Sequence, residues 1–232
     1  MASPVVLFDL DGTVLTFEGP PPGPGRTALD RAMRDLYARE DASRGIRFAG
    51  GTDRGLVRAL IERHDRADDA AIERVIASYL EHLDAVLKTR RYRPVGDVAA
   101  CVASLRGRGA GVGVATGNVR AGARLKLASA GLASTFDLAM GGFGCDAELR
   151  AEIVQTAVDR CRTGMRKDGK DGAAAPIVVV GDTEHDVRAA RAVGARVVGV
   201  AMSEAAHEEL LAAGADAIVR TCGDELVNAV LG

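Results

Sequence analysis

The hydrophobic and polar positions of the chain follow two patterns. Outside residues 18–92, short apolar runs alternate with longer segments in which apolar residues recur at helical spacing. The apolar runs predict strands at residues 5–8, 112–116, 136–140, 177–180, 196–200 and 217–219. Helices are expected between them, near 94–108, 119–130, 149–161, 184–193, 207–213 and 224–230. This alternation predicts an α/β fold, a doubly wound, Rossmann-like parallel sheet with helices on both faces.

Residues 18–92 have no such strand pattern. They begin with the proline- and glycine-rich stretch 18–25, which interrupts regular structure because proline removes a backbone donor and glycine permits bends. Apolar residues then recur at helical spacing over about 26–39, 53–64 and 68–90. We therefore expect a core domain of residues 1–17 and 93–232, with an all-helical cap domain of residues 18–92 inserted after the first strand.

Composition and charge exclude several classes of protein. The chain has 232 residues, of which 47% are hydrophobic, and a net charge of -2, so we expect a globular protein and no nucleic-acid partner. No apolar run approaches the length of a membrane span, and no secretion signal is visible at the N-terminus. The four cysteines have no metal-site spacing, which predicts reduced thiols in the cytoplasm. We expect a monomer or a homodimer.

Pairs of carboxylates follow two of the predicted strands. Asp9 and Asp11 come directly after the first apolar run, and Asp182 and Asp186 follow the run at 177–180. Ligands bind at the carboxyl edge of open α/β sheets, so we expect both pairs to lie at this edge. Close carboxylates repel each other, and a divalent cation relieves the repulsion. The pattern therefore predicts a site for Mg²⁺ and a phosphate.

The segment Phe8-Asp9-Leu10-Asp11-Gly12-Thr13 resembles the first motif of the haloacid dehalogenase-like superfamily. The resemblance implies that Asp9 is a nucleophile that forms an aspartyl-phosphate. It implies that Asp11 is the general acid/base, whose backbone carbonyl also helps to hold the metal. An acidic turn after an edge strand is the alternative explanation of these two residues.

Three later segments resemble the remaining motifs in family order. Thr116-Gly117-Asn118 resembles the second motif, and a hydroxyl, a glycine and an amide at a strand end make a phosphate-binding corner. Gly181-Asp182-Thr183-Glu184-His185-Asp186 resembles the fourth, which implies that Asp182 ligates Mg²⁺ and that Asp186 supports the metal directly or through water. Asp186 alternatively complements a helix dipole.

Arg150 lies near the place of the third motif, a Lys or Arg. The resemblance implies that it neutralises the charge of the phosphate and the aspartates. A solvated arginine is the alternative. Lys167 and Lys170 are rival candidates, but they fall in the polar stretch 163–175, where we expect a mobile loop.

The helical insertion resembles the cap of phosphoglycolate phosphatase-like members, in which the cap supplies specificity. Residues 48–54 resemble the cap loop that faces the active site, and we expect substrate contacts among Arg47, Thr52, Asp53 and Arg54. An arginine can hold a carboxylate through two hydrogen bonds, which suits a small phosphorylated acid. Alternatively, these residues only cap a helix and lie in solvent.

The combined expectation is a Mg²⁺-dependent phosphatase that hydrolyses a small phosphate monoester, either phosphoglycolate-like or a sugar phosphate. Its partner would be a small phosphorylated metabolite. Two alternatives stay open at this point. A mutase resembling β-phosphoglucomutase would return the phosphoryl group to a sugar instead of to water. A non-catalytic binding protein could use the same fold.

Overall fold

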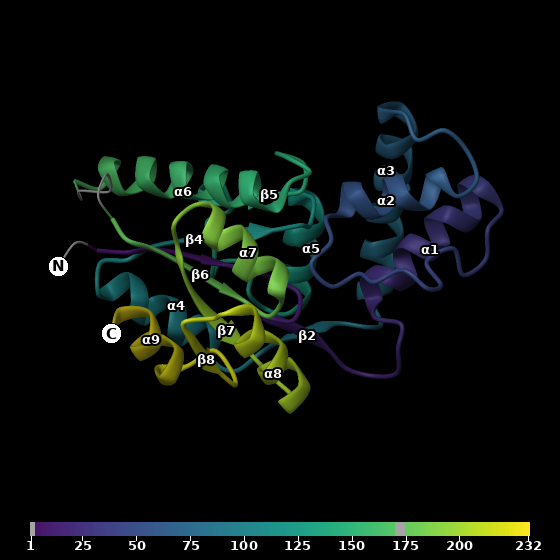
Figure 1. Cartoon of the computed structure of the whole chain (residues 1–232). Helices are drawn as coiled ribbons and strands as arrows, with labels where there is room; N and C mark the ends of the chain where they lie inside the picture. Colours follow the sequence, from purple (N-terminus) through teal and green to yellow (C-terminus); the bar gives the residue numbers. More distant parts are fainter. Residues whose placement is uncertain (1–2, 170–174) are drawn as a thin grey trace.

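The computed structural model describes residues 3–169 and 175–232, and within them it shows a six-stranded parallel sheet. The strand order is β5-β4-β1-β6-β7-β8 (Figure 1). The strands are β1 (Val5–Phe8), β4 (Gly111–Thr116), β5 (Gly142–Phe143), β6 (Ile177–Gly181), β7 (Arg196–Val200) and β8 (Ala217–Val219). Every pairing in this sheet is parallel, which confirms the predicted α/β class.

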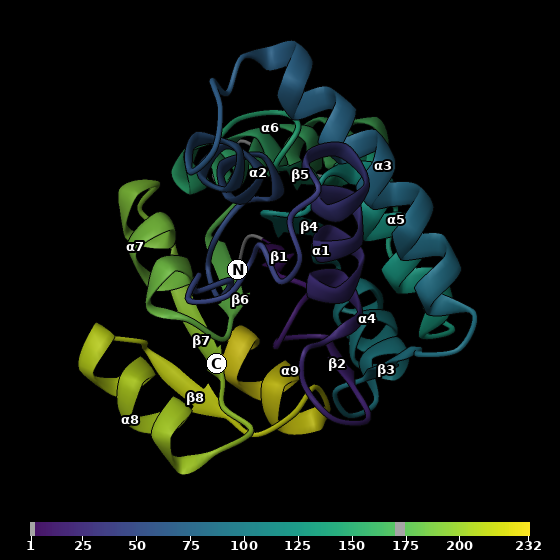
Figure 2. The ribbon, with the colours of Figure 1, turned by 90° about the vertical axis from the view of Figure 1, so that its right-hand side faces the viewer.

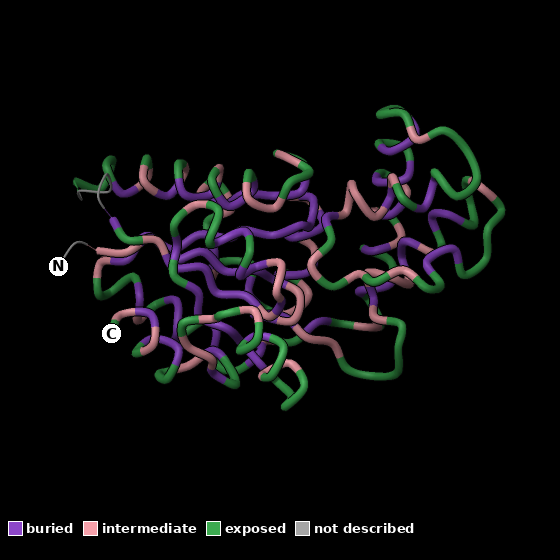
Figure 3. The backbone as a smooth tube through the Cα atoms, in the orientation of Figure 1, coloured by how far each residue is buried: buried purple, intermediate pink, exposed green. Residues whose placement is uncertain are grey.

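Helices cover both faces of the sheet. They are α4 (Val98–Gly107), α5 (Arg120–Ser129), α6 (Arg150–Lys167), α7 (Glu184–Ala192), α8 (Glu204–Ala213) and α9 (Asp224–Leu231). Side chains alternate along a strand, so β1 contributes to two apolar clusters. Val5 and Leu7 belong to the cluster that includes α6 and α7, while Val6 and Phe8 belong to the cluster that includes α4 and α9. All four β1 residues are fully buried, as Figure 3 shows for the centre of the sheet.

A helical insert, defined here as residues 18–91, lies beyond the carboxyl ends of the strands (Figures 1 and 2). It contains α1 (Pro24–Tyr37), α2 (Asp53–Glu62) and α3 (Asp69–Leu87), of which α1 and α3 pack against each other. Two short strands, β2 (Leu15–Phe17) and β3 (Tyr92–Pro94), pair antiparallel and connect the insert to the sheet. Within the described residues, no helix combines the length and apolar character that a membrane span requires.

The strand predicted at 136–140 is wrong. Residues Leu138–Met140 form a short 3-10 helix, η1, and the edge strand β5 follows it. The Asp137 side chain accepts a hydrogen bond from the backbone N–H of Ala139, which starts a turn where the apolar pattern suggested a strand. Phe136 is apolar because it packs edge-on against Phe8, with ring centroids 5.6 Å apart.

The loop predicted over 163–175 is wrong for its first part. Helix α6 continues to Lys167, because Met165 is buried against the sheet and extends the apolar stripe of the helix. Residues 170–174, including Lys170, lie outside the described residues. The helix predicted from residue 94 begins at Val98, after the Asp97 side chain accepts a hydrogen bond from Ala100 N. Strands β2 and β3 were not predicted, because neither is long enough to show alternation.

Candidate active site

The acidic residues that follow β1 and β6 lie side by side because these two strands are paired. Phe8 is in register with Val180, so Asp9 and Asp182 emerge close together at the carboxyl edge. Asp186 joins them from the first turn of α7. Among the described residues, carboxylate oxygens of Asp9, Asp182 and Asp186 all lie within 4.8 Å of one another. Three carboxylates at this separation suit a divalent cation that prefers oxygen ligands.

The electrostatics of these carboxylates support that fit. Burial raises the pKa of Asp9 to about 6, and the neighbouring Asp186 adds to the effect, while Arg150 opposes it. Burial together with Asp186 and Asp9 also raises the pKa of Asp182 well above its ordinary value. The protein's own charges therefore leave the group short of positive charge, which a bound cation would supply.

Arg150 stands at the N-terminus of α6 and bridges two of the acids. Its Nη2 lies 2.7 Å from Oδ2 of Asp9 and 2.6 Å from Oδ1 of Asp186. Its Nε donates to the same Asp186 oxygen at 3.1 Å. The second Asp186 oxygen accepts from the backbone N–H and the hydroxyl of Thr183, which caps α7. Asp186 thus fixes both Arg150 and the start of α7.

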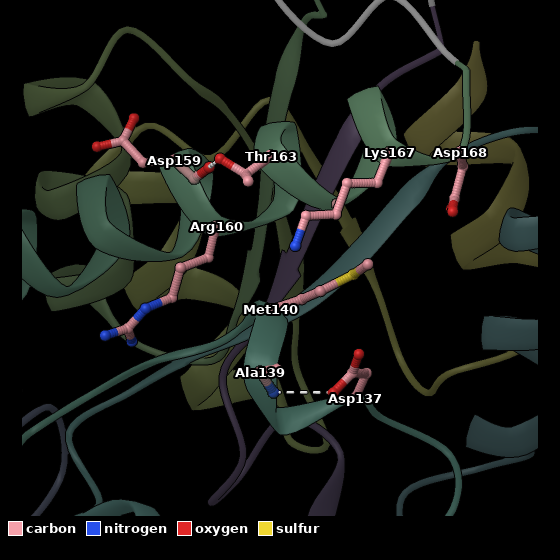
Figure 4. A pocket seen from close by; sticks show the side chains of 9 residues that line it. Asp137, Ala139, Met140, Asp159, Arg160, Thr163, Lys167 and Asp168 are labelled. Atoms are coloured by element: carbon pink, nitrogen blue, oxygen red, sulfur yellow. Dashed lines mark hydrogen bonds between the residues drawn. The ribbon is translucent and has the colours of Figure 1, made fainter.

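The structure separates Lys167 from this site. Lys167 ends α6, the helix that Arg150 begins, and it lines a second cavity of about 420 Å³ (Figure 4). Figure 4 shows its ammonium group pointing into that cavity, where Asp137 and Asp159 are also found. Of the three basic residues considered from the sequence, Arg150 alone is placed at the acids among the described residues.

The turn after β4 forms a polar corner beside Asp11. Asn118 Nδ2 donates to Thr116 Oγ1 and to Asp11 Oδ2, both at 2.8 Å. A Cβ on Gly117 would collide with the backbone of Gly51 in the helical insert, so only glycine fits there. Thr116, Gly117 and Asn118 all line the cavity that holds the acids.

Lys126, on α5, is a site residue that the sequence reading missed. Its Nζ lies 2.6 Å from Asp11 Oδ2 and 2.5 Å from Asn118 Oδ1, and its side chain is buried. Burial raises the pKa of Asp11, but the charge of Lys126 and the hydrogen bonds from Lys126 and Asn118 outweigh it, so the net pKa is lowered. A signal was present in the sequence, because Lys126 falls on the buried stripe of its helix beside Ala123 and Leu127.

The four residues expected to bind substrate from the insert lie in different places. Asp53 lines the cavity, but its Oδ2 accepts from the backbone N–H of Val119 at 2.8 Å. Burial raises the pKa of Asp53 to about 6. Thr52 is engaged in capping α2, accepting a hydrogen bond from Gly55 N at 3.1 Å. The insert is thus joined to the turn after β4 by polar contacts.

The two arginines expected to bind substrate also differ in position: Arg47 lines the cavity and Arg54 does not. Arg47 lines the cavity at its mouth, where its side chain is 62% exposed and its Nη2 lies 3.8 Å from a carboxylate oxygen of Glu209. Arg54 is not among the residues that line the cavity, and it pairs with Asp69 and Glu73 of the insert. Arg26, which the sequence reading did not consider, lines the cavity and places its guanidinium over the Phe48 ring.

The cavity enclosed by these groups has a volume of about 560 Å³. Its polar floor contains Asp9, Asp11, Asp182, Arg150 and Lys126, and its outer wall comes from the insert and the segments joining it to the sheet. This arrangement is suited to phosphoryl transfer. It combines the carboxylates of Asp9 and Asp11, an arginine that bridges two acids, and a cluster of three carboxylates that could hold a metal ion.

A model of a known protein family matches residues 4–194, under the description haloacid dehalogenase-like hydrolase. The chain belongs to this family. The resemblance predicted from the motifs is confirmed, and so is the expectation that the protein is an enzyme, since this is a family of hydrolases.

The similarity extends to whole proteins. The chain is 32% identical over 223 residues to "Probable phosphatase IndB" of Dickeya dadantii, covering 94% of this chain and 90% of that one. A hydrolase from Pseudomonas syringae has a similar structure, with a TM-score of 0.67, 18% identity and 98% coverage of both chains. A putative β-phosphoglucomutase from Thermotoga maritima has a TM-score of 0.62, 22% identity and 98% coverage of both chains. These two structures share the fold of this chain.

Proposed function

We propose that this hydrolase is a Mg²⁺-dependent phosphatase that cleaves a small phosphate monoester through an aspartyl-phosphate on Asp9. The observation that carries the proposal is the meeting of Asp9 with Asp182 and Asp186, bridged by Arg150. The similarity to a curated relative named as a probable phosphatase supports the same activity. We further propose that the helical insert acts as a cap and that the enzyme works in the cytoplasm, where its four free cysteines stay reduced.

In the first step, a carboxylate oxygen of Asp9 attacks phosphorus and the bond from phosphorus to the leaving oxygen breaks. Asp11, in its protonated form, gives its proton to the leaving alcohol. Thr116, Asn118 and Arg150 hold the phosphoryl oxygens during the transfer, which is the largest catalytic contribution expected in such a site. The products of this step are the alcohol and a phosphorylated Asp9.

In the second step, water attacks the phosphorus of the aspartyl-phosphate. Asp11 takes the proton from this water and Asp9 leaves as a carboxylate, so that inorganic phosphate is released. Asp11 lies against Lys126, whose charge favours the ionised form that this step requires. A bound Mg²⁺, held by Asp9, Asp182 and the Asp11 carbonyl with Asp186 in support, would neutralise negative charge on the carboxylates and the phosphate.

Hydrolysis of 4-nitrophenyl phosphate with Mg²⁺ tests this proposal. We expect phosphate release, a loss of kcat of about 10⁴-fold or more in Asp9→Asn, and no activity when the metal is chelated. Asp159→Asn, which changes an exposed carboxylate on α6 that accepts a hydrogen bond from Gln155, is the matched control and should retain full activity. Unchanged activity in Asp9→Asn would remove the assigned nucleophile. Incubation with a hexose 1-phosphate and a trace of the corresponding hexose 1,6-bisphosphate distinguishes a mutase, which would yield the hexose 6-phosphate without free phosphate.

A further inference from the structure

The outer wall of the active-site cavity is mostly apolar. Its apolar side chains come from the end of β2 and from the insert: Phe17, Pro21, Pro22, Ile46, Phe48 and Leu56. The Phe17 ring stands edge-on to Tyr92, with centroids 6.4 Å apart and an interplanar angle of 84°. The outer wall next to the polar floor therefore favours contact with apolar and aromatic parts of a ligand.

The polar side chains of this wall lie against other groups of the protein or at its exposed edge. The Tyr92 hydroxyl lies beside Asp11 and Gly25. Arg26 donates to the carbonyl oxygens of Ile46 and Ser43, and its guanidinium carbon lies 4.3 Å from the centre of the Phe48 ring. Arg47 stays at the exposed mouth.

These contacts argue against a leaving group rich in hydroxyls. A polyol bound here would give up hydrogen bonds to water for contact with a mostly apolar wall, which is unfavourable for buried hydroxyls. A planar ring loses little conformational freedom on binding and gains contact area from the same wall. The volume of about 560 Å³ also greatly exceeds the needs of a two-carbon phosphorylated acid.

We propose that the substrate is a phosphate monoester whose leaving group carries a planar ring. This inference rests on the phosphatase function proposed above and names its substrate class. The phosphate lies on the polar floor, and the ring lies against the apolar side chains of the outer wall, including Phe17, Phe48 and Leu56. An aryl-substituted alcohol and a nucleoside share this chemistry, and separate substrates distinguish them.

Two primary alkyl phosphates with similarly basic leaving alcohols, 2-phenylethyl phosphate and glycerol 1-phosphate, provide the test. Matching the leaving groups in this way separates recognition of the ring from intrinsic chemical reactivity. Phosphate release from both is measured with Mg²⁺, and we expect kcat/KM to be at least about 10-fold higher for 2-phenylethyl phosphate. Thymidine 5′-monophosphate is measured in parallel. A higher value for it than for 2-phenylethyl phosphate assigns the ring to a nucleoside, and a lower value assigns it to an aryl-substituted alcohol.

Variants localise the effect to the wall. Phe48→Ala should lower kcat/KM for 2-phenylethyl phosphate by about 10-fold and change that for glycerol 1-phosphate by less than about twofold. Phe48→Leu should restore part of the loss. Leu211→Ala, at a 63% exposed leucine on α8 outside the cavity, is the matched control and should change neither substrate.

Binding is measured separately from turnover, by calorimetry of both phosphates on Asp9→Asn with Mg²⁺. Tighter binding of 2-phenylethyl phosphate supports the inference even if no ester is hydrolysed, a result that would count against the proposed function alone. Equal or stronger binding and turnover of glycerol 1-phosphate, with generic phosphatase activity intact, would overturn the ring assignment and leave the phosphatase standing.

Discussion

Nζ of Lys126 lies 2.6 Å from Oδ2 of Asp11. The ion pair connects a buried position of α5 with the acid that follows β1. The two residues are 115 positions apart in the chain. The Lys126 side chain is buried, while the Asp11 side chain opens into the active-site cavity. This pairing fixes the direction of Asp11 and favours its ionised form, so Lys126 is expected to govern the proton transfers of Asp11.

Replacing Lys126 should therefore change the pH dependence of the second step. In Lys126→Met the pKa of Asp11 should rise, and the low-pH limb of kcat should move upward by about one pH unit or more. With 4-nitrophenyl phosphate the leaving group needs little protonation, so kcat reports mainly on the attack of water. The fall in kcat should be largest on the low-pH limb, where Asp11 of the variant is protonated and the wild-type residue is still ionised.

The exposed Lys88, which directly follows α3 and pairs with Asp84 four residues earlier, provides the control. Lys88→Met should leave the pH profile unchanged. If Lys126→Met lowered kcat with no movement of the low-pH limb, Lys126 would have a packing role and no influence on the protonation of Asp11.

Arg150 should contribute through its fork of hydrogen bonds as well as its charge. Arg150→Gln removes the charge that bridges Asp9 and Asp186, and we expect kcat to fall by about 10³-fold. Arg150→Lys keeps the charge but cannot reproduce the planar geometry, so it should recover only part of the loss. Steady-state kinetics measure both. Arg188→Gln, at an exposed arginine on α7, is the control, and similar losses in Arg188→Gln and Arg150→Gln would contradict a specific role.

Replacing Asp182 should change the Mg²⁺ requirement of the enzyme more directly than it changes the catalytic constants. Asp182→Asn removes one charged ligand from the acidic cluster, and we expect the Mg²⁺ concentration for half-maximal activity to rise about 10–100-fold. Excess Mg²⁺ should restore part of the rate. A titration of activity against Mg²⁺ after chelation measures this shift. An unchanged half-saturation in Asp182→Asn would place the metal elsewhere or remove it from the mechanism.

Asp53 offers a test that concerns stability instead of catalysis. Burial raises the pKa of Asp53 from its ordinary value of 3.8 to about 6, so the folded protein binds this proton more tightly than the unfolded chain. The resulting stabilisation is present below about pH 4 and is lost as the pH rises through about 6. Asp53→Asn keeps an oxygen that can accept from Val119 N but carries no charge.

We therefore expect Asp53→Asn to melt about 3 °C or more above the wild type at pH 7.5, with little difference near pH 4. Thermal unfolding at a series of pH values measures the difference. Asp84→Asn, at an exposed acid on α3, is the control. A lower melting temperature for Asp53→Asn at pH 7.5 would show that the charged carboxylate stabilises the contact with the turn after β4.

Most strands of the sheet could be predicted from the sequence because buried parallel strands have continuous apolar sequences, as in Val5–Phe8 and Ile177–Gly181. The acids at the ends of those two strands could be placed together from sheet topology alone. The strand at 136–140 was mispredicted because Phe136 is apolar for a tertiary reason, its contact with Phe8. Local periodicity cannot distinguish this cause from a strand.

The residues contributed by helices and by the insert were harder to predict. Lys126 does not belong to any of the sequence motifs, and its partner Asp11 is 115 positions away in the chain. Arg54 was expected to face substrate, but acids on α3 hold it outside the cavity lining. The positions of these side chains depend on how separate helices and strands pack together. The charge and spacing of residues within one segment do not determine that packing.

The central claim is that Asp9 becomes covalently phosphorylated, and trapping that species tests it most directly. The enzyme is mixed with substrate and Mg²⁺, quenched in acid, and reduced with borohydride, which converts an aspartyl-phosphate to homoserine. We predict homoserine at position 9 by peptide mass spectrometry, and none there in Asp9→Asn. Rapid phosphate release with homoserine absent from position 9, or present at another aspartate, would contradict the account.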